Sequence, residues 1–321
     1  MTLMNLSNTP ATPPTVWNIT AVERDTGISK DTLRMWERRY GFPKPDRDAS
    51  GERSYPEPQV DKLRLLKRLT DAGSRPGKII GLSLEELRRL SAAAAPVAAQ
   101  GEQADPAIIA AYMDLIRQHD ISAFRDKLSK DIAKNGIANT VKTVIAPLTW
   151  EVGESWRAGN LAIFEEHLFT ESLHVVLRGA INNASKGMPH SKTPRILLTT
   201  FSQEPHSLGL LMAEAWFTLE GCSCISLGTQ TPMWDIVQAA LRQQADVVAL
   251  SFSSGMGRQM VIDGLRELRH QLPPKIEIWA GGSSTALGRR MAEGVITTQA
   301  LDDITQEVAR WRTMHPAKMG R

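Results

Sequence analysis

Residues 195–221 read RILLTTFSQEPHSLGLLMAEAWFTLEG and decide the fold of the C-terminal part of the chain. The apolar run 195–201 predicts a buried β-strand, and 207–221 has the pattern of a helix. The polar segment between them contains Glu204 and His206. A strand, a polar loop and a helix in this order form the repeating unit of α/β folds.

The same alternation continues to the C-terminus. Further strands are expected at 222–228, 246–253, 276–282 and 295–299, and further helices at 232–244, 257–271, 286–294 and 301–314. Apolar strands alternating with amphipathic helices predict a Rossmann-like domain with a doubly wound parallel sheet over residues 191–321. This order places the loop 204–209 at the carboxyl edge of the sheet, where such sheets bind ligands.

The region before this domain is predicted to be helical. Residues 107–190 have breaks only near Gly136, Pro147 and Gly159, and their length suits about four helices, which predicts a helical bundle. Residues 91–106, SAAAAPVAAQGEQADP, are small, polar and Pro-containing, as is typical of a linker.

Two short helices are expected near the N-terminus. A capping-box pattern at Thr20–Glu23 begins the first, and Gly27 ends it. Ser29 caps the second, which Gly41 ends. Two short helices joined by a tight turn predict a helix-turn-helix.

A hairpin, or wing, is expected at 46–55, with helices at 59–72 and 83–90. The whole region 16–90 is thus a predicted winged helix-turn-helix domain. Residues 1–15 are rich in Pro, Thr and Asn and are expected to form a disordered arm.

Basic side chains concentrate in this N-terminal region. The net charge of the whole chain is only +3, but Lys and Arg outnumber Asp and Glu between Lys30 and Arg75. A local basic surface is what phosphate binding requires. A spacing of four residues aligns three basic side chains on the second helix, and the wing adds phosphate contacts. The side chains expected to contact DNA are Lys30, Arg34, Arg38, Arg39, Arg47, Arg53 and Tyr55.

The composition is that of an ordinary globular protein, with 42 % hydrophobic and 23 % charged residues. No apolar run approaches the ~20 residues of a membrane span, and residues 1–15 lack the pattern of a secretion signal. The two cysteines, Cys222 and Cys224, are too close in sequence for a structural disulfide. A reducing, cytoplasmic location is therefore expected.

The second predicted helix and its flanks carry a family resemblance. The string RMWERRYG at 34–41 resembles the MerR family of transcription regulators, in the form found where such domains are fused to cobalamin-binding domains. The resemblance covers residues 16–90 and implies binding to double-stranded promoter DNA.

A second resemblance lies in the α/β domain. The motif Glu204-Pro-His206-Ser-Leu-Gly209 is separated by 41 residues from Ser251-Phe-Ser253, and another 27 residues separate Ser253 from Gly281-Gly282. This resembles the signature of cobalamin-binding Rossmann domains, which read Asp-x-His-x-x-Gly, Ser-x-Leu or Ser-x-Thr, and Gly-Gly. Glu in place of Asp and Ser253 in place of Leu or Thr are departures.

The resemblance implies a role for each residue of this signature. His206 ligates cobalt from below, and Glu204 orients the other nitrogen of its ring. Gly209 lets the first helix start close to the nucleotide tail of the cofactor. Four residues hydrogen-bond or make room for the tail: Ser251, Ser253, Gly281 and Gly282.

A third motif lies in the helical region, where Trp156 is followed ten residues later by Glu166-His167. This resembles the CarH/LitR family of adenosylcobalamin-dependent photoreceptor repressors, in which these residues cover the upper ligand of cobalt. In that family the residue directly after the Trp is a His that takes the upper cobalt site after illumination, but in this chain the residue after Trp156 is Arg157. Arginine stays protonated and offers no lone pair, so the upper ligand and the role of light are open; His167 and His174 are alternative donors.

Together these resemblances imply a cobalamin-dependent regulator and not an enzyme, with no catalytic residues. It would be a light-responsive homo-oligomer, a dimer or tetramer, that represses carotenoid or light-defence genes. One alternative is a degenerate domain that binds another tetrapyrrole or a protein partner. A corrinoid methyl carrier is a second alternative, although a helix-turn-helix has no evident use there.

Overall fold

The computed structural model describes residues 16–48, 50–71, 74–93, 104–186, 193–288 and 294–316. The chain divides into two compact units, Met1–Ser91 and Ala92–Arg321, and each is treated by itself. The expected arm at 1–15 and most of the expected linker lie outside the described residues. The first linker residues are helical, because the preceding helix continues to Ala93.

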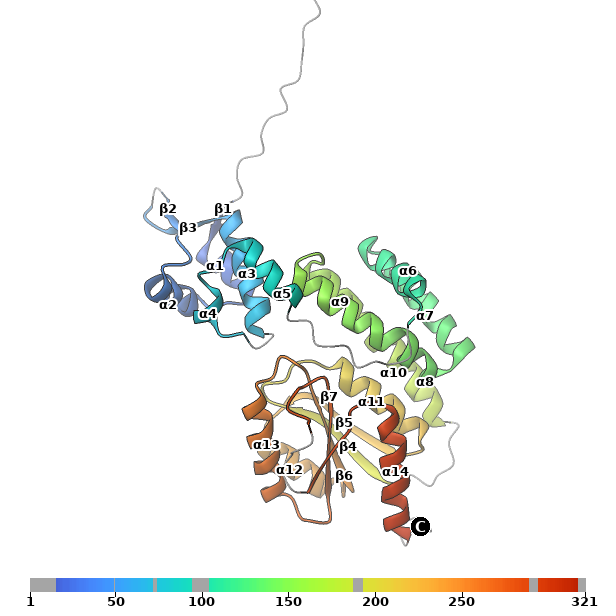
Figure 1. Ribbon diagram of the computed structural model, residues 1–321. Helices are drawn as coiled ribbons and strands as arrows, with labels where there is room; N and C mark the ends of the chain where they lie inside the picture. Colours follow the sequence, from blue (N-terminus) through green and yellow to red (C-terminus); the bar gives the residue numbers. More distant parts are fainter. Residues whose placement is uncertain are drawn as a thin grey trace, which may run out of the picture. The chain divides into compact units, whose positions relative to one another are not determined.

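The N-terminal unit is a winged helix-turn-helix (Figure 1). A small antiparallel sheet of order β1-β3-β2 forms the wing and joins it to the helices. The elements are β1 (Val16–Asn18), α1 (Ile19–Thr26), α2 (Lys30–Tyr40), β2 (Asp46–Arg47), β3 (Arg53–Pro56), α3 (Glu57–Asp71), α4 (Pro76–Ile79) and α5 (Leu84–Ala93).

Local sequence signals set the ends of the first two helices. Gly27 and Gly41 end α1 and α2 with φ of 68° and 67°, in the left-handed region that favours glycine. The Ser29 side chain accepts a hydrogen bond from the Thr32 N–H and caps α2, as predicted. The start predicted for α1 is wrong, because Asn18 is the residue whose side chain caps this helix.

The second unit begins with the predicted helical bundle. Its elements are α6 (Pro106–Arg117), α7 (Ile121–Asn135), α8 (Ile137–Thr140), the π-helical turn η1 (Val141–Ile145), α9 (Ala146–Ala158) and α10 (Ile163–Lys186). The break predicted at Pro147 does not occur, since helix continues from α8 to α9. The Ala146 N–H bonds to the Val141 carbonyl, and this wide turn relieves the clash of a proline ring with the preceding turn.

A five-stranded parallel sheet follows, of order β5-β4-β6-β7-β8. This confirms the predicted doubly wound domain. The strands are β4 (Arg195–Phe201), β5 (Ser223–Thr231), β6 (Val247–Phe252), β7 (Glu277–Gly282) and β8 (Val295–Thr297). The helices are α11 (Leu208–Leu219), α12 (Met233–Arg242), α13 (Arg258–Gln271) and α14 (Asp302–Met314). The helix expected at 286–294 is not seen at 286–288, which form turns, and 289–293 lie outside the described residues.

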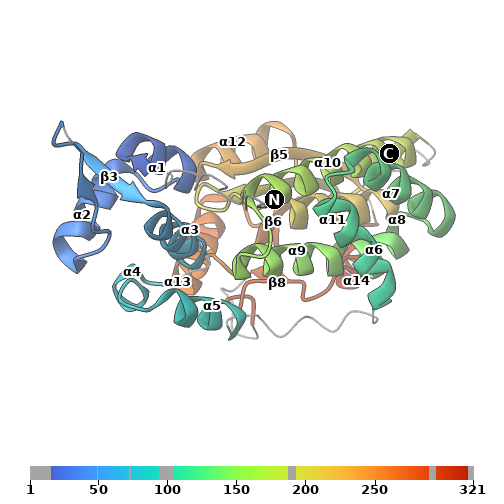
Figure 2. The ribbon, with the colours of Figure 1, turned by 90° about the horizontal axis from the view of Figure 1, so that it is seen from above.

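The two faces of this sheet have different cores. Helices α12 and α13 cover one face, and α11 and α14 cover the other (Figure 1). The core on the α11 side is continuous with that of the bundle, and α10 packs along α11 (Figure 2). Two ion pairs also join bundle and sheet domain, Arg178 with Glu214 at 3.0 Å and Lys142 with Asp302 at 2.8 Å. In the part of the chain that is described, no helix is long and apolar enough to cross a membrane.

Candidate cofactor and DNA-binding sites

The predicted ligand loop lies where the sheet changes winding direction. Strand β4 pairs with β5 on one side and with β6 on the other, so the loops after β4 and β6 meet at one carboxyl edge. The backbone N–H and the hydroxyl of Ser253, after β6, donate to Glu204 Oε2 at 2.7 and 2.8 Å. The structure therefore brings together two sequence motifs that are almost fifty residues apart.

Glu204 is the buried centre of this loop, with 1 % exposure, whereas the His206 side chain is 60 % exposed. The Nδ1 atom of His206 lies 2.5 Å from Glu204 Oε1. Burial by itself would raise the pKa of Glu204, but the hydrogen bonds from His206 and Ser253 outweigh it and lower this pKa. An ionised carboxylate only accepts, so Nδ1 carries the proton and Nε2 carries the lone pair that a metal would take.

A buried threonine fixes the backbone of the same loop. Thr200, near the end of β4, is fully buried and donates its hydroxyl to the Glu204 carbonyl at 2.6 Å. The hydroxyl oxygen of Thr200 also accepts a hydrogen bond from the Gln230 backbone N–H at 2.8 Å. Sequence reasoning missed Thr200, because nothing in a buried strand distinguishes a hydroxyl that fills space from one that orders a loop.

The predicted glycines are required by the packing of the chain itself. A Cβ on Gly209 would lie 2.7 Å from Ser251 Oγ, so the start of α11 lies close to the end of β6. A Cβ on Gly281 would lie 2.5 Å from Thr298 Oγ1. Gly282 has a φ of +118°, and a Cβ there would lie 2.2 Å from the Phe252 carbonyl oxygen. These contacts keep side chains away from the edge at which β6 and β7 end.

Helix α10 of the bundle contacts the ligand loop directly. His174 Nε2 lies 2.7 Å from the hydroxyl of Ser207, the residue after His206. Burial lowers the pKa of His174 and outweighs the opposing effect of Glu171, while Arg178 lowers this pKa and Glu214 raises it to smaller extents. The sequence suggested His174 only as a spare cobalt ligand, and its contact with Ser207 was not foreseen.

The three residues predicted for the upper face lie on α9 and α10. Trp156 is half-buried and packs against the core shared by bundle and sheet domain. Glu166 accepts a hydrogen bond from the Thr170 hydroxyl at 2.7 Å and lies 3.6 Å from the ring of His167, whose side chain is 70 % exposed. The Arg157 side chain lies outside the described residues. Glu166 thus bonds within its own helix, whereas Glu204 bonds to residues of two loops.

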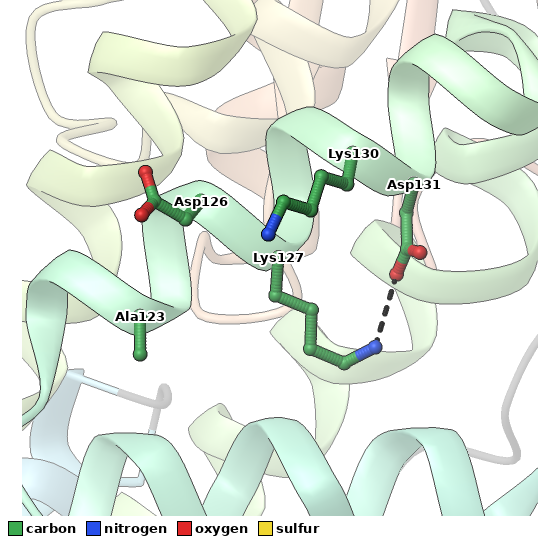
Figure 3. Close-up of a pocket in the computed structure, with 5 residues that line it drawn as sticks. All are labelled: Ala123, Asp126, Lys127, Lys130 and Asp131. Carbon is green, nitrogen blue, oxygen red and sulfur yellow. Dashed lines mark hydrogen bonds and ion pairs between the residues drawn. The ribbon is translucent and has the colours of Figure 1, made fainter.

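A shallow depression on α7 is separate from these motifs. Its lining residues all come from this one helix: Ala123, Asp126, Lys127, Lys130 and Asp131 (Figure 3). Lys127 pairs with Asp131 at 3.3 Å, and Tyr112 donates to the same carboxylate at 2.6 Å. These contacts stabilise the packing of α6 and α7, and we assign no ligand to the depression.

The predicted DNA-binding residues differ in how exposed their side chains are. The side chains of four arginines are exposed on α2 and the wing: Arg34, Arg38, Arg39 and Arg47. Lys30 is half-buried and pairs with Glu23 at 3.5 Å. Arg53 donates to Glu37 at 2.8 Å, so this half-buried pair connects the wing to α2.

The prediction for Tyr55 is wrong. Its side chain is fully buried in the core of the N-terminal unit and is therefore not available to phosphates. The strand β3 alternates its faces, so Tyr55 points inward. The sequence did not show this, because the inward face of β3 is set by its pairing with β1, in which Tyr55 lies opposite Trp17.

Comparison with known proteins agrees with both motifs. Residues 17–91 match the MerR HTH family of regulatory proteins, and residues 194–304 match the B12 binding domain. The chain is 30 % identical over 275 residues to the HTH-type transcriptional repressor CarH of Myxococcus xanthus, covering 83 % of this chain and 89 % of that protein. It is also 30 % identical over 243 residues to the repressor CarA of the same organism, covering 73 % and 75 %.

A solved structure shows the same fold for the second unit. The monomethylamine corrinoid protein of Methanosarcina barkeri superposes with a TM-score of 0.50 at 14 % identity, over 65 % of this chain and all of that one. The relatives at higher identity are regulators rather than enzymes. The chain therefore belongs to the CarH-like family of MerR-type transcription regulators, which carry a helix-turn-helix domain and a B12-binding domain.

Proposed function

We propose that the chain is a cytoplasmic, cobalamin-dependent and light-responsive repressor that binds promoter DNA. One observation supports this proposal above all: the buried carboxylate of Glu204 holds His206 Nδ1 at 2.5 Å and leaves the ring 60 % exposed. A histidine with one nitrogen bound to a carboxylate is the usual arrangement of a metal-ligating imidazole.

The residues around the loop fit a bound cobalamin. His206 Nε2 would hold the cobalt. Gly281 and Gly282 bring no side chain to the edge at which β6 and β7 end, and Ser251 and Ser253 would supply hydroxyls there for the nucleotide tail. Ser253 also holds Glu204, so the same residue would connect tail binding to the orientation of the ligand.

The upper face supports adenosylcobalamin as the form bound. Trp156 would pack on the adenosyl group, Glu166 would accept hydrogen bonds from its ribose, and His167 would lie beside it. Glu166 and His174 are eight residues apart on α10, which corresponds to about 12 Å along the helix axis. His174 contacts the ligand loop, so one helix would carry both a residue for the adenosyl group and a contact to the loop of His206.

The chain would use the cofactor as a switch. Adenosylcobalamin supplies a cobalt–carbon bond that light cleaves. In the dark, the bundle and sheet domain would close on the intact cofactor and favour a dimer or tetramer that occupies a promoter. After illumination, loss of the upper ligand would release Trp156 and Glu166 and weaken both assembly and DNA binding. Carotenoid and light-defence genes are the expected targets.

The decisive experiment uses purified full-length protein incubated with adenosylcobalamin in darkness. We expect an absorption spectrum of histidine-ligated cobalamin that changes after green light, with a parallel change in gel-filtration volume and promoter retention. Absence of cobalamin uptake would favour the alternative of another tetrapyrrole or a protein partner. Uptake without a response to light would retain the cobalamin site and reject the light switch.

The DNA-binding surface is tested by two arginine variants. Arg34→Ala should relax base preference, because a direct base contact is typically worth about 1–3 kcal/mol. Arg53→Ala should weaken binding to all sequences, since it breaks the Glu37 pair that holds the wing. Promoter retention measured at several salt concentrations distinguishes a loss of base preference from a general loss of binding. Wild-type binding by both variants would contradict this DNA-binding surface.

A further inference from the structure

Ser207 occupies a helix-capping position but does not cap its helix. It is the N-cap residue of α11, where serine is among the preferred residues because its hydroxyl accepts a backbone N–H. Here the backbone is helical, with φ −96° and ψ −25°, and the side chain makes no capping hydrogen bond. Its hydroxyl instead lies 2.7 Å from His174 Nε2. The Ser207 hydroxyl therefore contacts helix α10 of the bundle instead of capping α11.

His174 is suited to this contact by its surroundings. It is half-buried on α10, and burial favours its neutral ring. A neutral imidazole has one donor and one acceptor nitrogen, so either partner can supply the proton of a bond to a hydroxyl. The charged groups near the ring are Glu171, Arg178 and Glu214.

A second polar contact joins the same two helices one turn further along. Arg178 donates to both oxygens of Glu214, at 3.2 and 3.0 Å. This pair fixes α10 against the middle of α11, seven residues beyond Ser207. Of the two contacts, the one made by His174 reaches the residue bonded to His206.

We propose that His174 is a positioning residue that couples the helical bundle to the cobalt-ligand loop through Ser207. Helix α10 carries Glu166 and His167 about two turns before His174, so a shift of this helix at the upper face would move the backbone next to His206. The inference deepens the proposed function, but the coupling itself is a property of the cofactor-free chain.

The test compares His174→Phe, Ser207→Ala and the double variant in the full-length protein. Phenylalanine keeps the ring volume without a hydrogen-bonding nitrogen, and Ser207→Ala removes no cap from α11. In the cofactor-free proteins, backbone amides of residues 206–210 should exchange hydrogen faster by about fivefold in each single variant, the factor that a typical hydrogen bond represents. The double variant should exchange no faster than either single variant, because both remove the same bond.

The control is Arg178→Gln, which removes the other contact between the helices and should leave exchange at 206–210 within about twofold of wild type. The Kd for adenosylcobalamin should rise about fivefold in His174→Phe and be partly restored in His174→Gln. Equal loop exchange in wild type and Ser207→Ala, or additive effects in the double variant, would overturn the coupling. If wild type takes up no cobalamin, the proposed function fails, and the exchange data still decide on His174.

Discussion

The two faces proposed to enclose the cofactor differ in how far the chain alone assembles them. On the lower side, the carboxylate of Glu204 is buried and holds both His206 and Ser253 within 2.8 Å. On the upper side, Glu166 is bonded to a residue of its own helix, and His167 is 70 % exposed. Hydrogen bonds between two loops order the lower site, whereas on the upper side Trp156 packs against the core and Glu166 and His167 lie on one helix.

The difference follows from the elements that carry the residues. Loops at the edge of a parallel sheet are held at both ends by strands and helices, so hydrogen bonds between them cost little further ordering. An exposed side chain such as that of His167 on α10 keeps much of its freedom until a ligand restrains it, and binding must offset that entropy. We therefore expect substitutions in the loop of Glu204 and His206 to raise the Kd for every cobalamin. Substitutions of the upper-face residues should raise the Kd only for the form with an adenosyl group.

The largest effect is expected for His206→Ala. Removing the lower ligand should raise the Kd for adenosylcobalamin and hydroxocobalamin by more than the ~100-fold that the loss of an outer partner costs at most. The absorption bands of histidine-ligated cobalt should disappear as well. An unchanged spectrum in this variant would show that His206 is not the ligand.

Glu204→Gln should weaken binding of both cobalamins by about 10- to 100-fold, because an amide no longer fixes the tautomer of His206. Spectral titration measures this, with Glu165→Gln as a control carboxylate on the bundle. Equal loss in the two variants would contradict a specific role for Glu204.

Glu204→Gln also tests how the free energy of unfolding of the cofactor-free protein depends on pH. The pKa of Glu204 is lowered by its hydrogen bonds, which outweigh the effect of burial. Its contribution to stability is thus complete above its ordinary pKa of about 4.3 and is lost as the pH falls through the folded value. Denaturant titrations should show a gap between wild type and Glu204→Gln that closes in acid. A gap independent of pH would contradict this.

A smaller effect is expected for Thr200→Val, with Thr199→Val as the matched control. Both hydroxyls are fully buried and bonded to β5, but only that of Thr200 donates to the Glu204 backbone. Thr200→Val should raise the Kd for both cobalamins about five- to tenfold, and Thr199→Val should raise it about twofold or less. Similar values for the two variants would show that the hydroxyl only supports the strand.

The smallest effect is expected on the upper side. Glu166→Gln should raise the Kd for adenosylcobalamin about two- to fivefold, the loss of one partly exposed hydrogen bond, and leave that for hydroxocobalamin unchanged. Parallel titrations in the dark give the ratio of the Kd values for adenosylcobalamin and hydroxocobalamin. If both Kd values rise together, the upper residues act through the fold of the bundle, and the comparison between the two faces fails.

Much of the fold could be predicted because it depends on local pattern. The five strands and the ends of α1 and α2 at Gly27 and Gly41 follow from apolar periodicity and from glycine's access to positive φ. The strand β1 was missed, because three residues become a strand only by pairing with β3. The break expected at Pro147 was wrong, since a π-helical turn accommodates the ring.

The sequence by itself determined the doubly wound domain and the helix-turn-helix, because apolar periodicity and capping residues suffice for these. It predicted Glu204 and His206 as site residues through the resemblance of their motif to the cobalamin-binding signature. Only the tertiary structure decided that Tyr55 is buried, that Thr200 orders the loop and that Ser207 bonds to His174 instead of capping α11. Each of these depends on which segments distant in sequence come within hydrogen-bonding distance. A side chain with several possible partners takes the one that the packing of strands and helices brings to it.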